Sequence, residues 1–190
     1  MQLTKNSLFT LSVLTLFGFS GLAYFILIFS DSVHYFDIFV YDNLMISLPI
    51  GLGFGTVAAF IGLLLLKLPQ LKQTTTFYAN MFKGLDLELP DILFYSFCAG
   101  VGEELFFRGA LQPLIGLWFA AIVFVLLHGY VSIRDWKKSI YGLFLILISS
   151  GFGYLTLYLD IYAAMAAHFI FDVIMFLKLK QDSKLASEED

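Results

Sequence analysis

The sequence predicts an all-α membrane protein, a polytopic bundle of about six transmembrane helices around a polar intramembrane cavity. Of its 190 residues 59% are hydrophobic and only 14% are charged, and its mean hydropathy is +0.85. Soluble domains contain roughly 45–50% apolar and about 25% charged residues. The apolar residues also gather in runs that approach the length of a bilayer crossing, and ionisable residues interrupt only three of these runs.

A membrane-spanning helix needs about 20 predominantly apolar residues. Six segments approach this requirement, namely 8–30, 44–66, 91–111, 114–128, 139–159 and 161–177. The first is an uncharged run of 23 residues. It exceeds the roughly 7–15 apolar residues of a signal peptide and no A-x-A cleavage pattern follows it, so we expect a retained helix. The second contains Pro49 and several glycines, which membrane helices tolerate.

The remaining four helices are bounded by turn residues and charged links. The third is expected to end before Pro113, and the fourth, 114–128, is short. The link 31–43 contains aspartates but no lysine or arginine, whereas the links 67–90 and 130–138 are basic. Basic residues mark the cytoplasmic face, so both termini are predicted to be cytoplasmic. Segment 67–90 is long enough to be either a plain loop or an amphipathic segment on the membrane surface.

Composition limits the domain organisation and the partners. We expect one transmembrane domain, residues 1–180, followed by a polar tail, residues 181–190. The net charge of -4 gives no basic patch, so no nucleic-acid partner is expected. Cys98 is the single cysteine, which excludes a disulfide within the chain and a cysteine metal cluster. The lipid bilayer is the partner that this composition indicates.

Ionisable side chains within the predicted helices occur in the third, fourth and sixth only. At the bilayer centre each costs about 2.5–3.5 kcal/mol on insertion scales, so they should face one another or a wet cavity and not lipid. This pattern indicates an interior site, although a single Glu–Arg pair is more often a structural clamp. The residues are Glu103, Glu104, Arg108, His128, His168 and Asp172.

Spacing along each helix places these groups in pairs. Residues four apart share a helix face, so Glu104 can pair with Arg108, and Asp172 can orient His168 or share its task. Glu103 points about 100° away from Glu104 and is free for another role. Phe124 precedes His128 by four residues, which places an aromatic ring where it can fix the imidazole.

Such a set of groups suits amide hydrolysis. A carboxylate in a low-dielectric site can take and return protons, and imidazoles can stabilise an oxyanion or bind a metal. Two histidines and one carboxylate, here Glu103, His128 and His168, also form a catalytic zinc set with an open position for water. The residue types leave open whether a divalent metal such as zinc or the glutamate alone activates the water.

Three short motifs resemble those of the CPBP intramembrane proteases, also called the Abi or type II CAAX prenyl endopeptidase family. They are "EELFFR" at 103–108, "FVLLH" at 124–128 and "HFIFD" at 168–172, in the family's order and each within an apolar segment. The resemblance covers about residues 90–178. It implies a helical bundle with a conical cavity open to the cytosolic leaflet and cleavage of a peptide or protein substrate near the cytosolic membrane face.

The resemblance also implies roles for the six residues. Glu103 would activate the water, and His128 and His168 would position it, stabilise the oxyanion or ligate a metal. Arg108 would hold Glu104. Asp172 stands where the family more often has asparagine, so it would belong to the oxyanion region or orient a histidine. The short chain resembles bacterial members, which predicts an integral protein of the bacterial inner membrane.

Two other functions remain open from the sequence. One is a non-catalytic membrane protein of the same fold, such as a bacteriocin-immunity or scaffold protein. The other is a small ion or proton carrier, because carboxylate and histidine chains also form proton relays. No internal inverted repeat of the transporter kind is present in the sequence, which favours the protease.

Overall fold

A computed structural model describes residues 4–30, 34–41, 43–83, 85–131 and 136–188. Helices are the only regular structure in these residues, which confirms the predicted all-α fold. The α-helices are α1 (Lys5–Leu14), α2 (Ser20–Ile28), α3 (Leu44–Leu66), α4 (Lys72–Phe82), α5 (Leu89–Glu104), α6 (Gln112–Ile115), α7 (Leu117–Leu127), α8 (Trp136–Tyr158) and α9 (Ile161–Glu188). The π-helical turns are η1 (Thr15–Phe19) and η4 (Leu105–Leu111), and the 3₁₀ turns are η2 (Tyr35–Phe39) and η3 (Pro69–Leu71).

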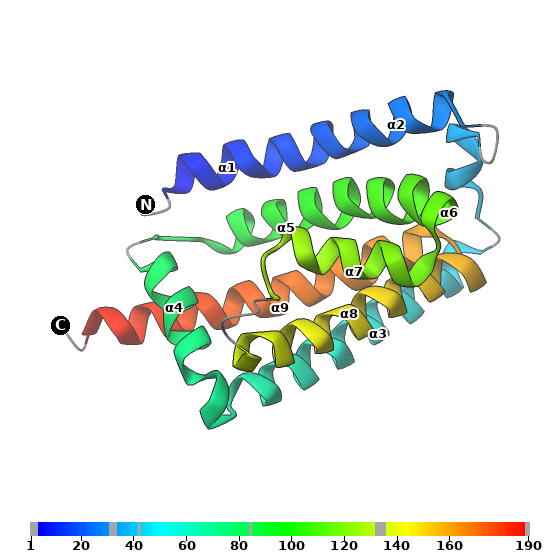
Figure 1. The fold of residues 1–190 in the computed structure, drawn as a ribbon. Coiled ribbons are helices and arrows are strands. Elements are labelled where there is room, and N and C mark those ends of the chain that lie inside the picture. The colour runs from blue at the N-terminus through cyan, green and yellow to red at the C-terminus, as the bar shows by residue number, and fades with distance from the viewer. Residues whose placement is uncertain (1–3, 31–33, 42, 84, 132–135, 189–190) are drawn as a thin grey trace.

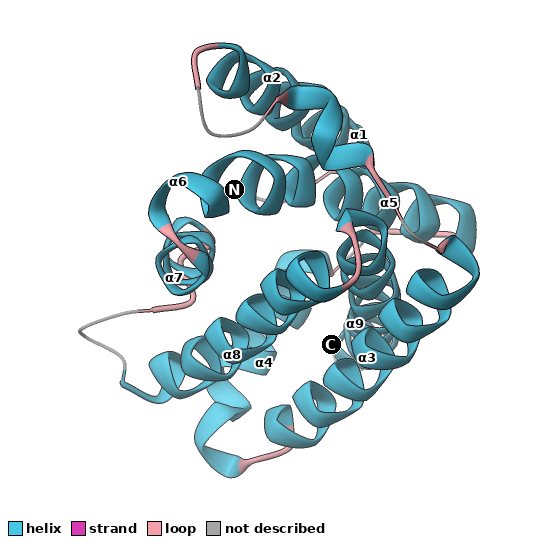
Figure 2. Ribbon diagram, turned by 90° about the vertical axis from the view of Figure 1, so that its right-hand side faces the viewer, coloured by secondary structure: helices cyan, strands magenta, loops and turns pink. Residues whose placement is uncertain are grey.

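The long helices run side by side along one axis, and both chain ends lie at the same end of the bundle (Figure 1). At that end α4 lies across the bundle, so segment 67–90 contains a helix of its own. α9 packs against α3, α4, α5 and α8 and is the central helix, whereas α1 and α2 lie at the edge beside α5 and η4 (Figure 2). α9 also continues through residues 181–188, which were expected to be a tail.

Four helical segments are long and apolar enough to cross a membrane, namely Lys5–Ile28, Leu44–Leu66, Ser139–Tyr158 and Ile161–Ser183. They make the chain an integral membrane protein. The other two predicted spans are also helical, but one carries the charged residues and the other, α7, has only 11 residues. The inner-membrane location and the cytoplasmic termini stay predictions.

The boundary between the third and fourth predicted helices differs from the expectation. The helix does not stop before Pro113, because η4 widens the backbone directly ahead of the proline, and α6 continues to Ile115. The break comes instead at Gly116, whose φ of 86° lies in a region that favours glycine. α7 therefore begins at Leu117, and at 1.5 Å per residue it spans only about 16 Å, roughly half of a bilayer core.

α3 and α9 approach so closely that small residues are required between them. Gly51 faces the backbone of Ala163, and Gly55 faces that of Ala167. A methyl group added at Gly55 would overlap the carbonyl oxygen of Ala167. Because His168 follows Ala167 directly, this contact fixes the height and rotation of the α9 segment that carries the histidine.

We expect Gly55→Ala to destabilise the protein by about 1–3 kcal/mol, the usual range for overpacking a tight contact. The added methyl must push α3 away from α9, so thermal unfolding in detergent should move to lower temperature. Gly53→Ala is the matched control, because Gly53 is exposed and a methyl group there meets nothing within 4 Å. Equal melting temperatures for the two variants would contradict the proposed contact.

A second close approach supports the end of α5. Gly102 packs against the backbone of Thr15 and Leu16, at the π-helical turn η1 of the first span. A side chain at this position would overlap the Thr15 carbonyl oxygen. The next residue is Glu103, so the first span holds the backbone segment from which the acidic pair projects.

Candidate active site

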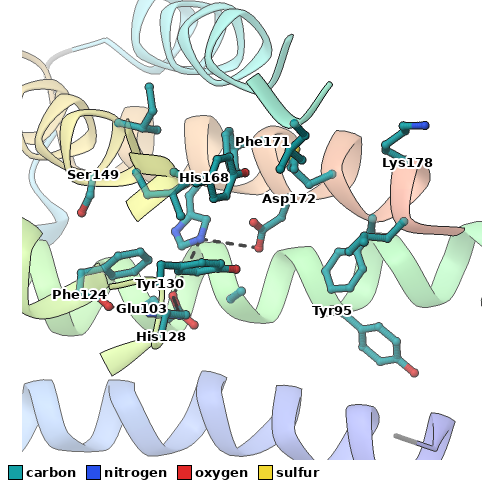
Figure 3. Close-up of a pocket in the computed structure, with 18 of the residues that line it drawn as sticks. Tyr95, Glu103, Phe124, His128, Tyr130, Ser149, His168, Phe171, Asp172 and Lys178 are labelled. Atoms are coloured by element: carbon teal, nitrogen blue, oxygen red, sulfur yellow. Dashed lines mark hydrogen bonds and ion pairs between the residues drawn. The ribbon is translucent and has the colours of Figure 1, made fainter. Parts of the chain in front are cut away.

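All six residues predicted for the site come together in the interior of the bundle. Figure 3 shows four of them, namely Glu103, His128, His168 and Asp172. Three helical segments, α5–η4, α7 and α9, supply them. The acidic pair ends α5, the first histidine is the C-cap of α7, and the second histidine and the aspartate lie one turn apart on α9. The segments that the sequence singled out for their ionisable residues therefore converge on one site.

The short α7 explains how His128 reaches the depth of Glu103. A helix that crossed the whole bilayer core, about 30 Å thick, would carry its last residue to the membrane face. α7 instead ends halfway along the bundle, where His128 Nε2 lies 3.5 Å from Glu103 Oε2 (Figure 1). Among the described residues that follow, Gly129 has a φ of 70° and turns the chain away from the helix.

Glu103 faces both imidazoles. Its Oε2 atom is 3.5 Å from His128 Nε2 and 3.9 Å from His168 Nε2. Both separations exceed an ordinary N–H···O hydrogen bond of 2.7–3.2 Å. Residue Glu103 is only 8% exposed, yet it lines the cavity. Its carboxylate is thus the point at which the two histidines and the cavity meet.

Hydrogen bonds fix the orientation of both rings. His168 Nδ1–H donates to Glu104 Oε1 at 2.8 Å, and His128 Nδ1–H donates to the carbonyl oxygen of Phe124 at 2.7 Å. The Phe124 ring also packs on His128, with ring centroids 4.4 Å apart. With each Nδ1 held in this way, both Nε2 atoms are directed toward Glu103.

Asp172 does not lie where it could orient His168 through the Nδ1 atom of the ring. Its Oδ2 atom is 3.6 Å from His168 Nε2, on the side of the ring that faces Glu103. The group that holds the opposite nitrogen, Nδ1, is Glu104. Asp172 lines the cavity (Figure 3). Its position suits contact with a reacting group, whereas the orienting role belongs to Glu104.

Arg108 is paired with Glu104, as the four-residue spacing predicts. The Nε to Oε2 distance is 3.1 Å, and both side chains are at most 1% exposed. Two partners on α8 were missed by the sequence analysis. Arg108 Nη2–H donates to Ser149 Oγ at 3.0 Å, and the guanidinium lies 5.9 Å from the ring centroid of Phe152. The sequence gives no signal for these two residues, because serine and phenylalanine are common in apolar helices.

A cavity of about 360 Å³ leads from Glu103 toward the end of the bundle where the chain termini lie. Mostly apolar side chains line it, with the carboxylates and imidazoles at its inner end and Lys178 at its outer end (Figure 3). A mainly apolar cavity with a few convergent polar groups is typical of a ligand or substrate site.

Three residues of the site are of the types that bind zinc. Glu103, His128 and His168 have the residue types of a catalytic zinc set, and each Nδ1 is held as in a metal-ligating histidine. Within the described part of the chain, however, no group of three or more His, Cys, Asp or Glu side chains has an arrangement that could hold a metal ion. Metal dependence therefore stays a prediction for experiment.

The fold and the site define a class, a helical membrane protein with a buried carboxylate and imidazole centre at the inner end of a cavity. Residues 85–174 match the family model described as type II CAAX prenyl endopeptidase Rce1-like, and all six site residues fall within this segment. The match to the Rce1-like family model at residues 85–174 confirms the predicted resemblance to the CPBP family.

One relative is the uncharacterized protein YpbD of Bacillus subtilis (strain 168). The two chains are 31% identical over 93 residues, which is 48% of this chain and 47% of YpbD. The match thus spans about half the length of that relative. No solved structure matches the chain.

Proposed function

We propose that this protein is an intramembrane endopeptidase that hydrolyses a peptide bond with a water molecule activated by Glu103. One observation carries the proposal: within a buried cavity the Glu103 carboxylate faces the Nε2 atoms of His128 and His168 at 3.5 and 3.9 Å. The Rce1-like match supports a peptide as the substrate class, because the family description is that of an endopeptidase.

In the proposed reaction Glu103 acts first as a base and then as an acid. It takes a proton from water while the water oxygen attacks the carbonyl carbon of the peptide bond. It then delivers that proton to the amide nitrogen as the C–N bond breaks. A positioned carboxylate can contribute about 10²–10⁴-fold to such a step. The buried surroundings strengthen each electrostatic interaction within the site.

The imidazoles flank the attacking water and face the oxyanion that forms. His168 Nδ1–H is already donated to Glu104, so a hydrogen bond from Nε2 to the oxyanion requires a proton on both ring nitrogens. The positive charge of that imidazolium stabilises the oxyanion further. Asp172, 3.6 Å from the same Nε2 atom, lies where it can contact the reacting carbonyl or hold the second proton of His168.

The cavity suits a short extended peptide that enters from the membrane face where the chain termini lie. Lys178, at the outer end, is about 15 Å along α9 from His168 at 1.5 Å per residue. An extended chain covers that distance in about four or five residues. The scissile bond would then lie at Glu103, with apolar side chains of the cavity around the flanking residues.

Membrane proteomics tests the activity without a known substrate. Cells that produce the wild-type protein are compared with cells that produce an inactive Glu103 variant, and new protein termini are identified in their membranes. We expect termini that depend on Glu103 and lie next to a transmembrane or lipid-anchored segment. Identical sets of termini in both membranes would contradict the proposal.

Removal of metal separates the two ways of activating water. If Glu103 acts without a metal, cleavage by the purified protein is expected to persist after treatment with a chelator, and the protein should contain no stoichiometric zinc. Metal content and cleavage are measured on the same preparation. Loss of cleavage that added Zn²⁺ restores would instead assign Glu103, His128 and His168 to a metal site.

A further inference from the structure

We propose that Ser149 on α8 is a positioning residue, which acts through Arg108 and Glu104 to hold His168 in its working orientation. The inference rests on the proposed function for its effect on cleavage, but its effect on His168 can be measured without any substrate. Ser149 is 2% exposed and lines the cavity. It extends the polar network to α8, a helix that carries none of the six predicted site residues.

Three contacts connect Ser149 with the histidine. Ser149 Oγ accepts a hydrogen bond from Arg108 Nη2–H at 3.0 Å. The Arg108 Nε atom lies 3.1 Å from Glu104 Oε2, and Glu104 Oε1 accepts the Nδ1–H of His168 at 2.8 Å. Each oxygen of the Glu104 carboxylate therefore has a different partner, so a rotation of the guanidinium must also turn the group that holds His168.

The Ser149 hydroxyl is important for the orientation of Arg108, because the guanidinium has few other hydrogen-bond partners. Within the described part of the chain, Arg108 Nη1 has no acceptor, and Nε meets Glu104 as an ion pair without good hydrogen-bond geometry. The rings of Phe124 and Phe152 lie 5.3 and 5.9 Å from the guanidinium carbon. These rings restrict the guanidinium, and among the described residues Ser149 is the hydrogen-bond acceptor that orients its Nη2 end.

Phe152, one turn further along α8, contributes a second contact to the same histidine. Its ring stacks on His168 with centroids 5.4 Å apart and an interplanar angle of 21°. Ser149 and Phe152 are three residues apart and so share a helix face. α8 thus presents one hydrogen-bond acceptor and one aromatic ring to the network, and small shifts of α8 are passed on to His168.

Ser150 is a matched control within the same helix. It is 3% exposed, close to the exposure of Ser149. Its hydroxyl donates to the carbonyl oxygen of Leu147 at 2.8 Å, within α8 itself. Ser150→Ala therefore removes a buried hydroxyl from the neighbouring position without touching Arg108, and it reports the effect of the substitution on α8 alone.

The test records imidazole nitrogen resonances of ¹⁵N-histidine-labelled protein in detergent micelles. The chain has three histidines, and single His→Gln variants assign each signal. We expect Ser149→Ala to shift the Nδ1 resonance of His168, and Ser149→Thr, which keeps the hydroxyl, to restore it. Ser150→Ala should leave it unchanged. On a substrate found by membrane proteomics, Ser149→Ala should lower kcat by up to about 100-fold with little change in KM.

Unchanged His168 resonances in Ser149→Ala, or equal shifts in Ser150→Ala, would overturn the inference. If Ser149→Ala does not fold, Ser149→Cys, which has nearly the same size but a weaker acceptor, is measured in its place and judged in the same way. The resonances also separate the two proposals. Absence of any Glu103-dependent cleavage contradicts the proposed function, whereas the His168 signals decide the role of Ser149 in either case.

Discussion

Glu103→Gln is expected to lower the rate of peptide cleavage by about 10²–10⁴-fold, the usual contribution of a general base. Glutamine keeps the size of the side chain, but its amide cannot take a proton from water. The substitution should leave the fold intact, because the contacts of Glu103 with the two imidazoles, at 3.5 and 3.9 Å, are longer than hydrogen bonds. Cleavage of a substrate reconstituted with the protein in vesicles gives the rate.

Asp86→Asn provides the control, because Asp86 is an exposed carboxylate outside the helices. It should cleave at the wild-type rate. Cleavage by Glu103→Gln at the wild-type rate would contradict the proposed catalytic role of Glu103. A biological effect that persists in a Glu103→Gln/His168→Gln variant would favour a scaffold or immunity protein. Proton flux across liposomes that depends on Glu103 would favour a proton relay.

The long helices could be predicted from the sequence because their apolar runs are nearly uninterrupted. Segment 44–66 coincides with α3, in which Pro49 is accommodated within the helix. The third and fourth helices could not be divided correctly. Pro113 is the stronger helix breaker in general, but η4 lets the helix pass it, and the break depends on the positive φ of Gly116. A π-helical turn has no clear signature in the sequence.

The convergence of the six candidate residues could also be predicted, because an ionisable side chain in a membrane span needs a partner or a cavity. Spacing within one helix correctly paired Glu104 with Arg108. It could not predict that Glu104, and not Asp172, holds His168 Nδ1, because this contact depends on how α5 and α9 are rotated against each other. For the same reason Ser149 could not be predicted, because its contact with Arg108 joins α8 to η4, which are distant in the sequence.

Arg108→Met is expected to destabilise the protein by about 3–5 kcal/mol, the usual effect of removing one partner of a buried ion pair. Glu104 is fully buried, so without the guanidinium its carboxylate would be left as an uncompensated charge. Methionine keeps much of the side-chain volume. The free energy of unfolding is obtained by titrating the protein in mixed micelles with sodium dodecyl sulfate.

Lys178→Met is the matched control, because Lys178 and Asp182 form an ion pair with the same four-residue spacing on α9. Their side chains are 34% and 18% exposed, against at most 1% for Arg108 and Glu104. Partly solvated pairs contribute only about 0–1 kcal/mol, so this variant should unfold almost as the wild type does. Equal losses in the two variants would show that burial does not set the effect.

The double variant Glu104→Gln/Arg108→Met separates charge from packing. Removing both charges eliminates the uncompensated carboxylate, so we expect most of the lost stability to return, as when apolar residues replace a buried pair. The glutamine oxygen can still accept the Nδ1–H of His168, but without the negative charge that stabilises its imidazolium. Cleavage should therefore stay well below the wild-type rate although the fold recovers. A double variant no more stable than Arg108→Met would instead indicate that Arg108 acts through packing against Phe124 and Phe152.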